Sequence, residues 1–128
     1  MKYILLFAGT MDEQAAYDSL SPEERTAAYA RVNDWFSVYY KAGKIVSAEE
    51  LRGADTATTV TFKSGKPIVT DGPFIEAKEV IGGFAVVDVA DLDEALAMAK
   101  AWPGGSAVEV RPVIEHTADE YNTGNTAS

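Results

Sequence analysis

The segment from Thr70 to Glu79, TDGPFIEAKE, gathers the side chains best suited to chemistry: three carboxylates, Asp71, Glu76 and Glu79, beside Lys78. A carboxylate at the end of a strand can act as a general base when burial raises its pKa. Asp71 is therefore a candidate catalytic residue, and its charged neighbours are candidate ligand-binding residues. A structural role competes with this interpretation, because Asp-Gly-Pro is itself a competent turn sequence.

The residue types argue against a catalytic triad, a metal site and a phosphate-binding site. The single histidine, His116, lies where no element supplies the orienting carboxylate that a catalytic triad needs, so we interpret it as a solvated tail residue. One histidine and no cysteine argue against a zinc site. The chain also lacks a calcium-binding loop motif and a phosphate-binding loop motif. We expect no metal and no cofactor.

Two further groups of residues could line a cavity. Glu49, Glu50 and Arg52 form a second polar cluster, which we interpret as a solvated loop. The helix that follows Ser21 carries more aromatic residues than one face can bury, so Tyr29 or Tyr40 is expected to line a cavity or an interface.

Composition narrows the possible partners. The 128 residues include 20 acidic and 11 basic side chains, for a net charge of −9. This charge argues against nucleic acid, which needs clustered lysine and arginine, and against an anionic membrane surface. The longest apolar run, Ile4 to Ala8, is too short for a membrane span or a signal peptide. We expect a cytoplasmic protein with one domain at 1–115 and a mobile tail at 116–128.

Periodicity and turn residues predict the elements that position these groups. Ser21-Pro22-Glu23-Glu24 is a capping box that starts a helix. Gly82-Gly83 indicates a bulge or a close backbone approach, and Pro112 a sheet edge or strand end. We assign 10–20 to a loop with at most one helical turn and 49–55 to a polar connection. We predict helices at 22–42 and 92–101, and strands at 2–8, from 45, and at 56–63, 67–70, 80–89 and 108–114.

This order of elements is typical of an α+β fold, the ferredoxin-like split βαβ pattern with an added hairpin. Its two helices can cover only one face of the sheet. Yet the strands at 3–7 and 84–87 are apolar on both faces, which leaves a patch that soluble monomers avoid. We expect a homodimer to cover it, with coverage by the tail or the hairpin as the alternative.

A long motif links the chain to a known family. The string TDGPFIEAKEVIGGFAVVDVADLDEALAMA, followed by GSAVEVRPV, resembles the DGPF group of the YCII-related proteins, and KYILLFAG, AGKIVSAEEL and ATTV fit as well. The resemblance covers about residues 2 to 114. It implies a ferredoxin-like fold that pairs face to face into a dimeric α+β barrel. Wider members resemble lyases or isomerases with a His and an Asp in the cavity. DGPF genes often lie near those of alternative sigma factors.

The resemblance assigns site residues one by one. Asp71 matches the Asp of DGPF. Glu76, Lys78 and Glu79 match the charged residues that follow it. Arg111 matches the Arg of the last strand, so it joins the ligand-binding candidates. The helix histidine of the wider family falls near Val32 or Asn33, and neither is an imidazole. This departure favours a small-molecule-binding homodimer, regulatory and associated with a sigma factor. The alternative is a small lyase or isomerase that uses Asp71 as general base.

Overall fold

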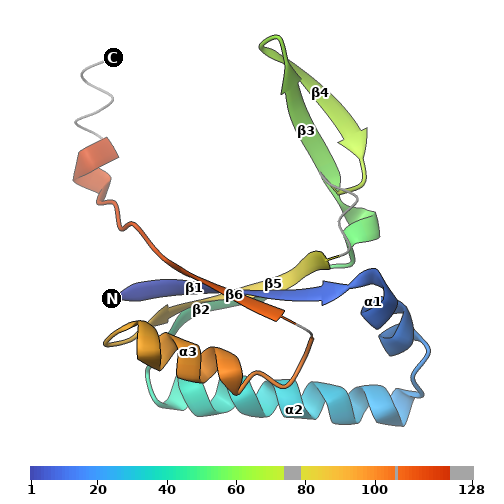
Figure 1. Cartoon of the computed structure of the whole chain (residues 1–128), viewed down its shortest axis with the longest axis vertical. Coiled ribbons are helices and arrows are strands. Elements are labelled where there is room, and N and C mark those ends of the chain that lie inside the picture. Colours follow the sequence, from blue (N-terminus) through green and yellow to red (C-terminus); the bar gives the residue numbers. More distant parts are fainter. Residues whose placement is uncertain (74–78, 106, 122–128) are drawn as a thin grey trace.

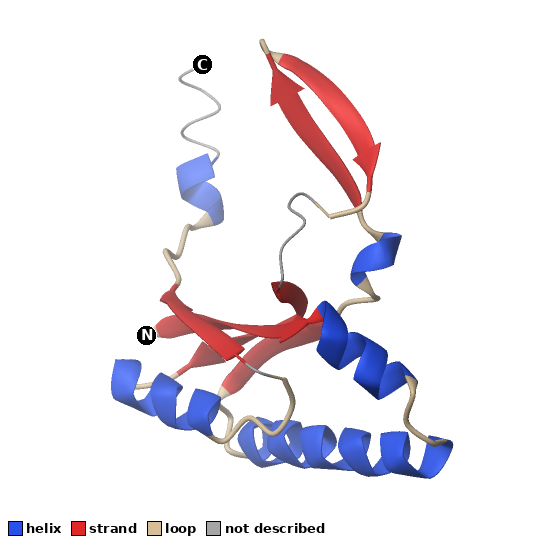
Figure 2. Ribbon diagram, turned by 45° about the vertical axis from the view of Figure 1, so that its right-hand side comes forward, coloured by secondary structure: helices blue, strands red, loops and turns tan. Residues whose placement is uncertain are grey.

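The computed structural model of the chain describes residues 1–73, 79–105 and 107–121, and shows a mixed α+β fold (Figures 1 and 2). Its elements are β1 (Lys2–Thr10), α1 (Met11–Asp18), α2 (Pro22–Lys41), β2 (Ile45–Glu50), the short 3-10 helix η1 (Ala54–Thr56), β3 (Thr58–Lys63), β4 (Lys66–Asp71), β5 (Glu79–Asp88), α3 (Leu92–Lys100) and β6 (Ala107–Pro112).

The strands form two antiparallel sheets. The larger has four strands in the order β2-β5-β1-β6, and the smaller is the β3–β4 hairpin. Helices α2 and α3 both lie against one face of the larger sheet (Figure 1). The predicted order of the main elements is confirmed, and so is the placement of both long helices on a single face.

The core lies between this sheet and the two helices. Tyr3, Leu5 and Phe7 alternate along β1 toward the helices, with Leu5 fully buried. They meet Trp35 of α2, whose indole Nε1 donates a 2.9 Å hydrogen bond to the carbonyl of Met98 in α3. Alternating burial of this kind is expected when only one face of a strand is covered.

The helix that follows Ser21 begins as predicted. The Ser21 hydroxyl accepts from the Glu24 amide, and the Glu24 carboxylate accepts from the Ser21 amide, which closes the capping box. The loop predicted over 10–20 is wrong, because residues 11–18 form the helix α1. The Thr10 hydroxyl caps it by accepting from the Glu13 amide at 3.0 Å, and acidic residues in its first turn suit the positive end of the helix.

The glycine pair in β5 does what its sequence indicates. Phe7 pairs with Gly83 and Ala8 with Ile81, so Gly82 is the extra residue of a β-bulge. A Cβ on Gly83 would lie 2.9 Å from the carbonyl oxygen of Glu49, which confirms the close backbone approach. The polar connection predicted over 49–55 starts too early, because Glu49 and Glu50 pair with β5 as the last residues of β2.

Among the residues that the structure describes, no helix lies against the far face of the sheet. Ile4 pairs with Val86 and Leu6 with Phe84, and these side chains alternate with the core-facing set. All four are partly exposed. The hairpin and the segment after β6 extend away from this face rather than lying across it (Figures 1 and 2). The expected apolar face is therefore present, and nothing in the described part of the chain covers it.

The chain after β6 ends its described part in one helical turn at residues 118–121. There the His116 Nδ1 lies 2.8 Å from the Glu120 carboxylate, and both side chains are about half exposed. Within the described residues, no helix has both the length and the apolar character needed to cross a membrane.

Candidate functional site

A groove of about 970 Å³ opens on the helix side of the sheet, where α1 and α2 meet the ends of β1, β2 and β5 and the loop at 102–105. This volume is at the upper end of the range of small-molecule sites, ~300–1,000 Å³. Its lining has two parts: an aromatic wall next to the core and a polar rim next to solvent.

The aromatic wall is centred on Phe7 and Trp102. Their rings stack at 3.9 Å with 18° between planes, and Phe36 meets both edge-on at 6.2 and 5.8 Å. Tyr40 continues the wall along α2, with its ring 6.4 Å from that of Phe36. Flat, preorganised aromatic surfaces of this kind suit the apolar body of a small organic molecule.

A glycine holds the loop of Trp102 against the sheet. Gly105 has a φ of +90°, and a Cβ there would lie 2.8 Å from the carbonyl oxygen of Ala8. Only glycine accepts both the left-handed backbone and the close approach. The GG sequence after Pro103 therefore shapes this end of the groove.

The polar rim is organised by a hydrogen bond between distant elements. The Tyr29 hydroxyl donates to Glu50 Oε1 at 2.7 Å, from the first half of α2 to the last residue of β2. This bond, together with partial burial, raises the pKa of Tyr29 to about 12. A phenol with that pKa remains protonated near neutral pH, so Tyr29 serves as a hydrogen-bonding group and not as a base.

Charged residues complete the rim. Arg31 and Arg52 line the groove from α2 and from the chain after β2, together with Glu13 and Glu50. The interpretation of Glu49, Glu50 and Arg52 as a solvated loop is therefore only half right: they are exposed, but Glu50 and Arg52 border the groove. Tyr29 and Tyr40 both line it, as expected for the surplus aromatic residues of α2.

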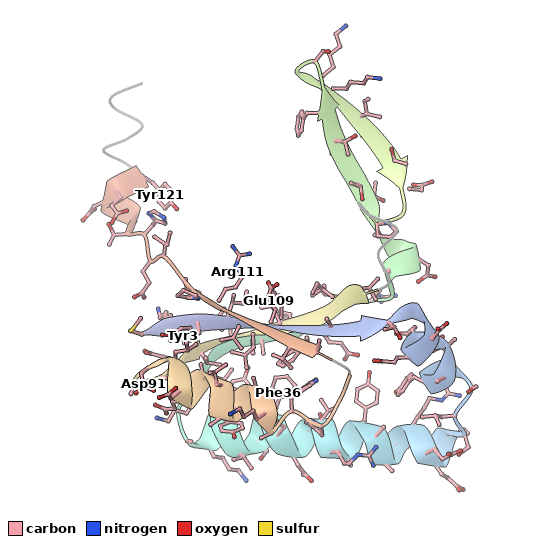
Figure 3. The ribbon with its side chains drawn as sticks, viewed as in Figure 1. Tyr3, Phe36, Asp91, Glu109, Arg111 and Tyr121 are labelled. Carbon is pink, nitrogen blue, oxygen red and sulfur yellow. The ribbon has the colours of Figure 1, made fainter. Side chains whose placement is uncertain are left out.

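The predicted site residues do not converge on the groove. Asp71 is exposed at the end of β4, and the neighbouring Gly72 amide donates to the Ala57 carbonyl at 2.8 Å. Arg111 is exposed on β6, opposite Ile4, and points to the helix-free face of the sheet (Figure 3). Neither belongs to the described lining of the groove, and they lie in different sheets.

The remaining candidates lie at or beyond the edge of what the structure describes. Glu79 begins β5 and its backbone pairs with Thr10, which lines the groove; its side chain is outside the described part. Glu76 and Lys78 lie outside the described residues. In the described chain, no three carboxylate or imidazole side chains come close enough to hold a metal ion.

Sequence reasoning missed most of the groove because its walls come from separate elements. Thr10, Tyr29, Glu50 and Trp102 lie far apart in the sequence and meet only through the fold. Two signals did point there: the surplus of aromatic residues on α2, which predicts Tyr29 or Tyr40 in a cavity or an interface, and the position of the family's histidine. Val32 and Asn33, where the resemblance places the histidine of the wider family, both line the groove.

Comparison with known proteins identifies the family of the chain. Residues 1–117 match the YCII-related domain. The chain belongs to the YCII-related family. An uncharacterized protein of Rhizobium meliloti (strain 1021), R00369, is 42% identical over 86 residues, which cover 64% of this chain and 69% of that protein. The YCII-related match extends through β6 and thus includes every element that forms the groove.

Proposed function

We propose that the protein is a cytoplasmic homodimer of the DGPF group that binds a small organic ligand in the groove between α1, α2 and the sheet. The observation that carries the proposal is the groove itself. A stacked aromatic wall and a rim with both carboxylates and guanidinium groups meet in one concave site of suitable volume. Apolar walls with a few placed polar groups are typical of small-molecule sites.

Binding without turnover fits the residues on the rim. The groove lining includes no imidazole in the described chain, and its hydroxyl at Tyr29 is held protonated by Glu50. The arginines Arg31 and Arg52 would attract an anionic group, and the ring of Trp102 would stack on a planar one. Small aromatic and phenolic acids combine these features, so they form the ligand class to test.

The dimer would form through the helix-free face of the sheet. The centre of this face is the apolar set Ile4, Leu6, Phe84 and Val86. Polar residues frame it from the edge strands: Glu109 and Arg111 on β6 (Figure 3), and, from the pairing of β2 with β5, Ser47 and Glu49 on β2. An apolar centre with a polar rim is the usual anatomy of a protein interface, and two-fold pairing would let one surface cover itself.

The strand order supports the finer fold assignment. Strands β1 and β2 are joined through α2 and have β5 between them, while β5 and β6 are joined through α3 and have β1 between them. Two such interleaved units with their helices on one face make a ferredoxin-like sheet, to which β3 and β4 add a hairpin. We propose that two of these sheets stack as a dimeric α+β barrel. A regulatory role linked to a sigma factor rests on the family resemblance.

A thermal-shift screen with a matched pair of variants tests the binding site. Ala28 lines the groove from α2, and its neighbour Ala27 is exposed outside the described lining. A ligand that binds the folded state raises the melting temperature. Small aromatic acids that stabilise the wild-type protein should lose this effect in the Ala28→Trp variant and keep it in the Ala27→Trp variant. Equal shifts in both variants would place the ligand elsewhere.

Light scattering tests the dimer. At micromolar concentration the protein should have twice the chain mass of 13.7 kDa. A monomer at that concentration would refute the stacked sheets while leaving the groove intact as a ligand site.

A further inference from the structure

The hydrogen bond between Tyr29 and Glu50 leaves acceptor atoms at this point of the groove rim. A phenol has one proton, and the Tyr29 hydroxyl donates it to Glu50 Oε1 at 2.7 Å. The lone pairs of the phenol oxygen and the second carboxylate oxygen, Oε2, remain to accept. Within the described chain, no other group donates to the Glu50 carboxylate. A ligand group that meets this pair must therefore bring its own donor.

The surroundings of Tyr29 keep its proton in place. Its ring meets that of Tyr17 in α1 edge-on at 6.2 Å. The hydrogen bond to Glu50, burial and the nearby Tyr17 together raise the pKa of Tyr29 to about 12. A phenol with this pKa remains protonated near neutral pH, so the pair keeps the same donor and acceptor roles over the physiological range.

The guanidinium groups of the rim have the opposite character. Arg31 and Arg52 line the same groove, and a guanidinium group donates hydrogen bonds but cannot accept them. Among the described residues, neither arginine forms an ion pair. A ligand carboxylate would satisfy these donors with charge-assisted hydrogen bonds. The rim therefore offers donors for an anion and, separately, acceptors for a hydroxyl or an amine.

The aromatic wall sets the kind of molecule that carries these two groups. The stacked rings of Phe7 and Trp102 line the same groove as Tyr29 and Glu50. A planar ring packs well on such a surface, but the wall itself does not distinguish one substituted ring from another. Discrimination between ligands must therefore come from the polar rim.

We propose that the Tyr29–Glu50 pair determines the specificity of the groove, and that it selects aromatic acids that carry a hydroxyl or amino donor on the ring. The inference rests on the ligand site proposed above and names its ligand class. An acid whose second substituent can only accept, such as a methyl ether, would place its oxygen against the acceptors of the pair. Both sides would then lack a donor, which costs affinity.

Matched ligands test this selection on the full chain. Isothermal titration calorimetry compares 3- and 4-hydroxybenzoate and 3- and 4-aminobenzoate with the methoxybenzoate of the same position. At one position or both, a donor-bearing acid should bind the wild-type protein at least tenfold more tightly than the methoxy acid, because a hydrogen bond to a charged acceptor contributes about that factor. Equal affinities at both positions would overturn the proposal.

Variants separate hydrogen bonding from ligand size. Glu50→Gln places an amide N–H in the pair, which can donate to a methoxy oxygen, so the preference for the donor-bearing acid should fall at least fivefold. Tyr29→Phe removes one of the acceptors and should also reduce it. Glu23→Gln makes the same chemical change at an exposed residue of α2 outside the described lining, and should keep the full preference. A preference that survives in both Glu50→Gln and Tyr29→Phe would be one of size and would refute the role of the pair.

The same titrations distinguish this inference from the ligand site on which it rests. If none of these acids binds the wild-type protein at millimolar concentration, the ligand class proposed for the groove fails and the selection fails with it. If the acids bind, lose affinity in Ala28→Trp and show no donor preference, the groove stands as their site. Only the selection by Tyr29 and Glu50 is then refuted.

Discussion

The hydroxyl of Tyr29 donates a 2.7 Å hydrogen bond to the carboxylate of Glu50, and so ties α2 to the end of β2 across the rim of the groove. The two residues are 21 positions apart, and the bond spans the chain reversal between helix and strand. It fixes the position of a phenol in the groove that Arg52 also lines. A fixed polar rim over an aromatic wall is what distinguishes this groove from an accidental gap between elements.

The first prediction concerns the titration of Tyr29. Its pKa is raised to about 12, first by the hydrogen bond to Glu50 and then by burial. The Glu50→Gln variant removes the negative charge and should lower the pKa of Tyr29 toward its ordinary value near 10. Ultraviolet difference titration measures it, with the Tyr29→Phe protein subtracted to isolate this phenol. An unchanged pKa would mean that the carboxylate does not hold the proton.

The raised pKa of Tyr29 also predicts the direction in which the free energy of unfolding changes with pH. The pKa of Tyr29 is raised in the folded state, so its contribution is complete below about pH 10, the unfolded value, and is lost as the pH rises toward 12. The free energy of unfolding should therefore fall more steeply between these pH values in the wild type than in Tyr29→Phe. Parallel curves for the two proteins would contradict the assignment.

The second prediction concerns the core that supports the groove. Trp35 is buried, meets Phe7 and Trp102 edge-on, and donates to the Met98 carbonyl. Trp35→Ala leaves a cavity and an unpaired buried carbonyl, and should cost about 3–5 kcal/mol of unfolding free energy. Val38→Ala on the same helix, where the side chain is 60% exposed, should cost less than about 0.5 kcal/mol. Urea unfolding measures both, and similar costs would contradict the assigned core.

Local signals made much of the fold predictable. The capping box at Ser21 and Glu24, the bulge at Gly82 and the strand end at Pro112 each follow from a few adjacent residues. Helix α1 was missed because it has only four apolar residues, Met11, Ala15, Ala16 and Tyr17, three of them consecutive, which is too few for a sustained helical period. The pattern of Thr10 followed three positions later by Glu13 was the available signal, and the Thr10 cap is present.

The candidate site was harder to predict because its contacts are long-range. The carboxylates after Asp71 drew attention because they are close in sequence, yet Asp71 itself is exposed on a hairpin away from the groove. Glu50 looked like a loop residue, and only the antiparallel pairing of β2 with β5 brings it opposite α2. Single-sequence patterns record neighbours along the chain, and a groove is made from neighbours in space.

The third prediction concerns the backbone that closes the groove. Gly105 has a φ of +90°, and a Cβ there would lie 2.8 Å from the Ala8 carbonyl oxygen. Gly43 after α2 has a φ of +72°, but a Cβ there would meet no described atom within 4 Å. Gly43→Ala should cost about 1–2 kcal/mol for the left-handed backbone alone.

Gly105→Ala adds a steric clash to the same backbone penalty and should cost more, on the order of 3 kcal/mol. Because the loop would move away from β1, this variant should also weaken any ligand that binds beside Trp102. Chemical unfolding gives the two costs, and tryptophan fluorescence reports the environment of the loop. Equal costs at the two glycines would show that the loop is not held against Ala8.

The last prediction separates the two functions considered for Asp71. If Asp71 were the general base of a lyase or isomerase, Asp71→Asn would abolish binding or turnover and leave the fold intact. The residue is exposed at the end of β4, and the adjacent Gly72 amide is taken by the Ala57 carbonyl. We therefore expect Asp71→Asn to change the unfolding free energy by less than about 0.5 kcal/mol, the range of exposed substitutions.

Ligands found in the thermal-shift screen should bind the Asp71→Asn protein with wild-type affinity, because they occupy the groove. Calorimetry on this variant, with Ala28→Trp as the binding-deficient control, measures the comparison. If a fully folded Asp71→Asn protein lost affinity, the ligand site would lie at the hairpin. The lyase or isomerase hypothesis, with Asp71 as general base, would then be favoured.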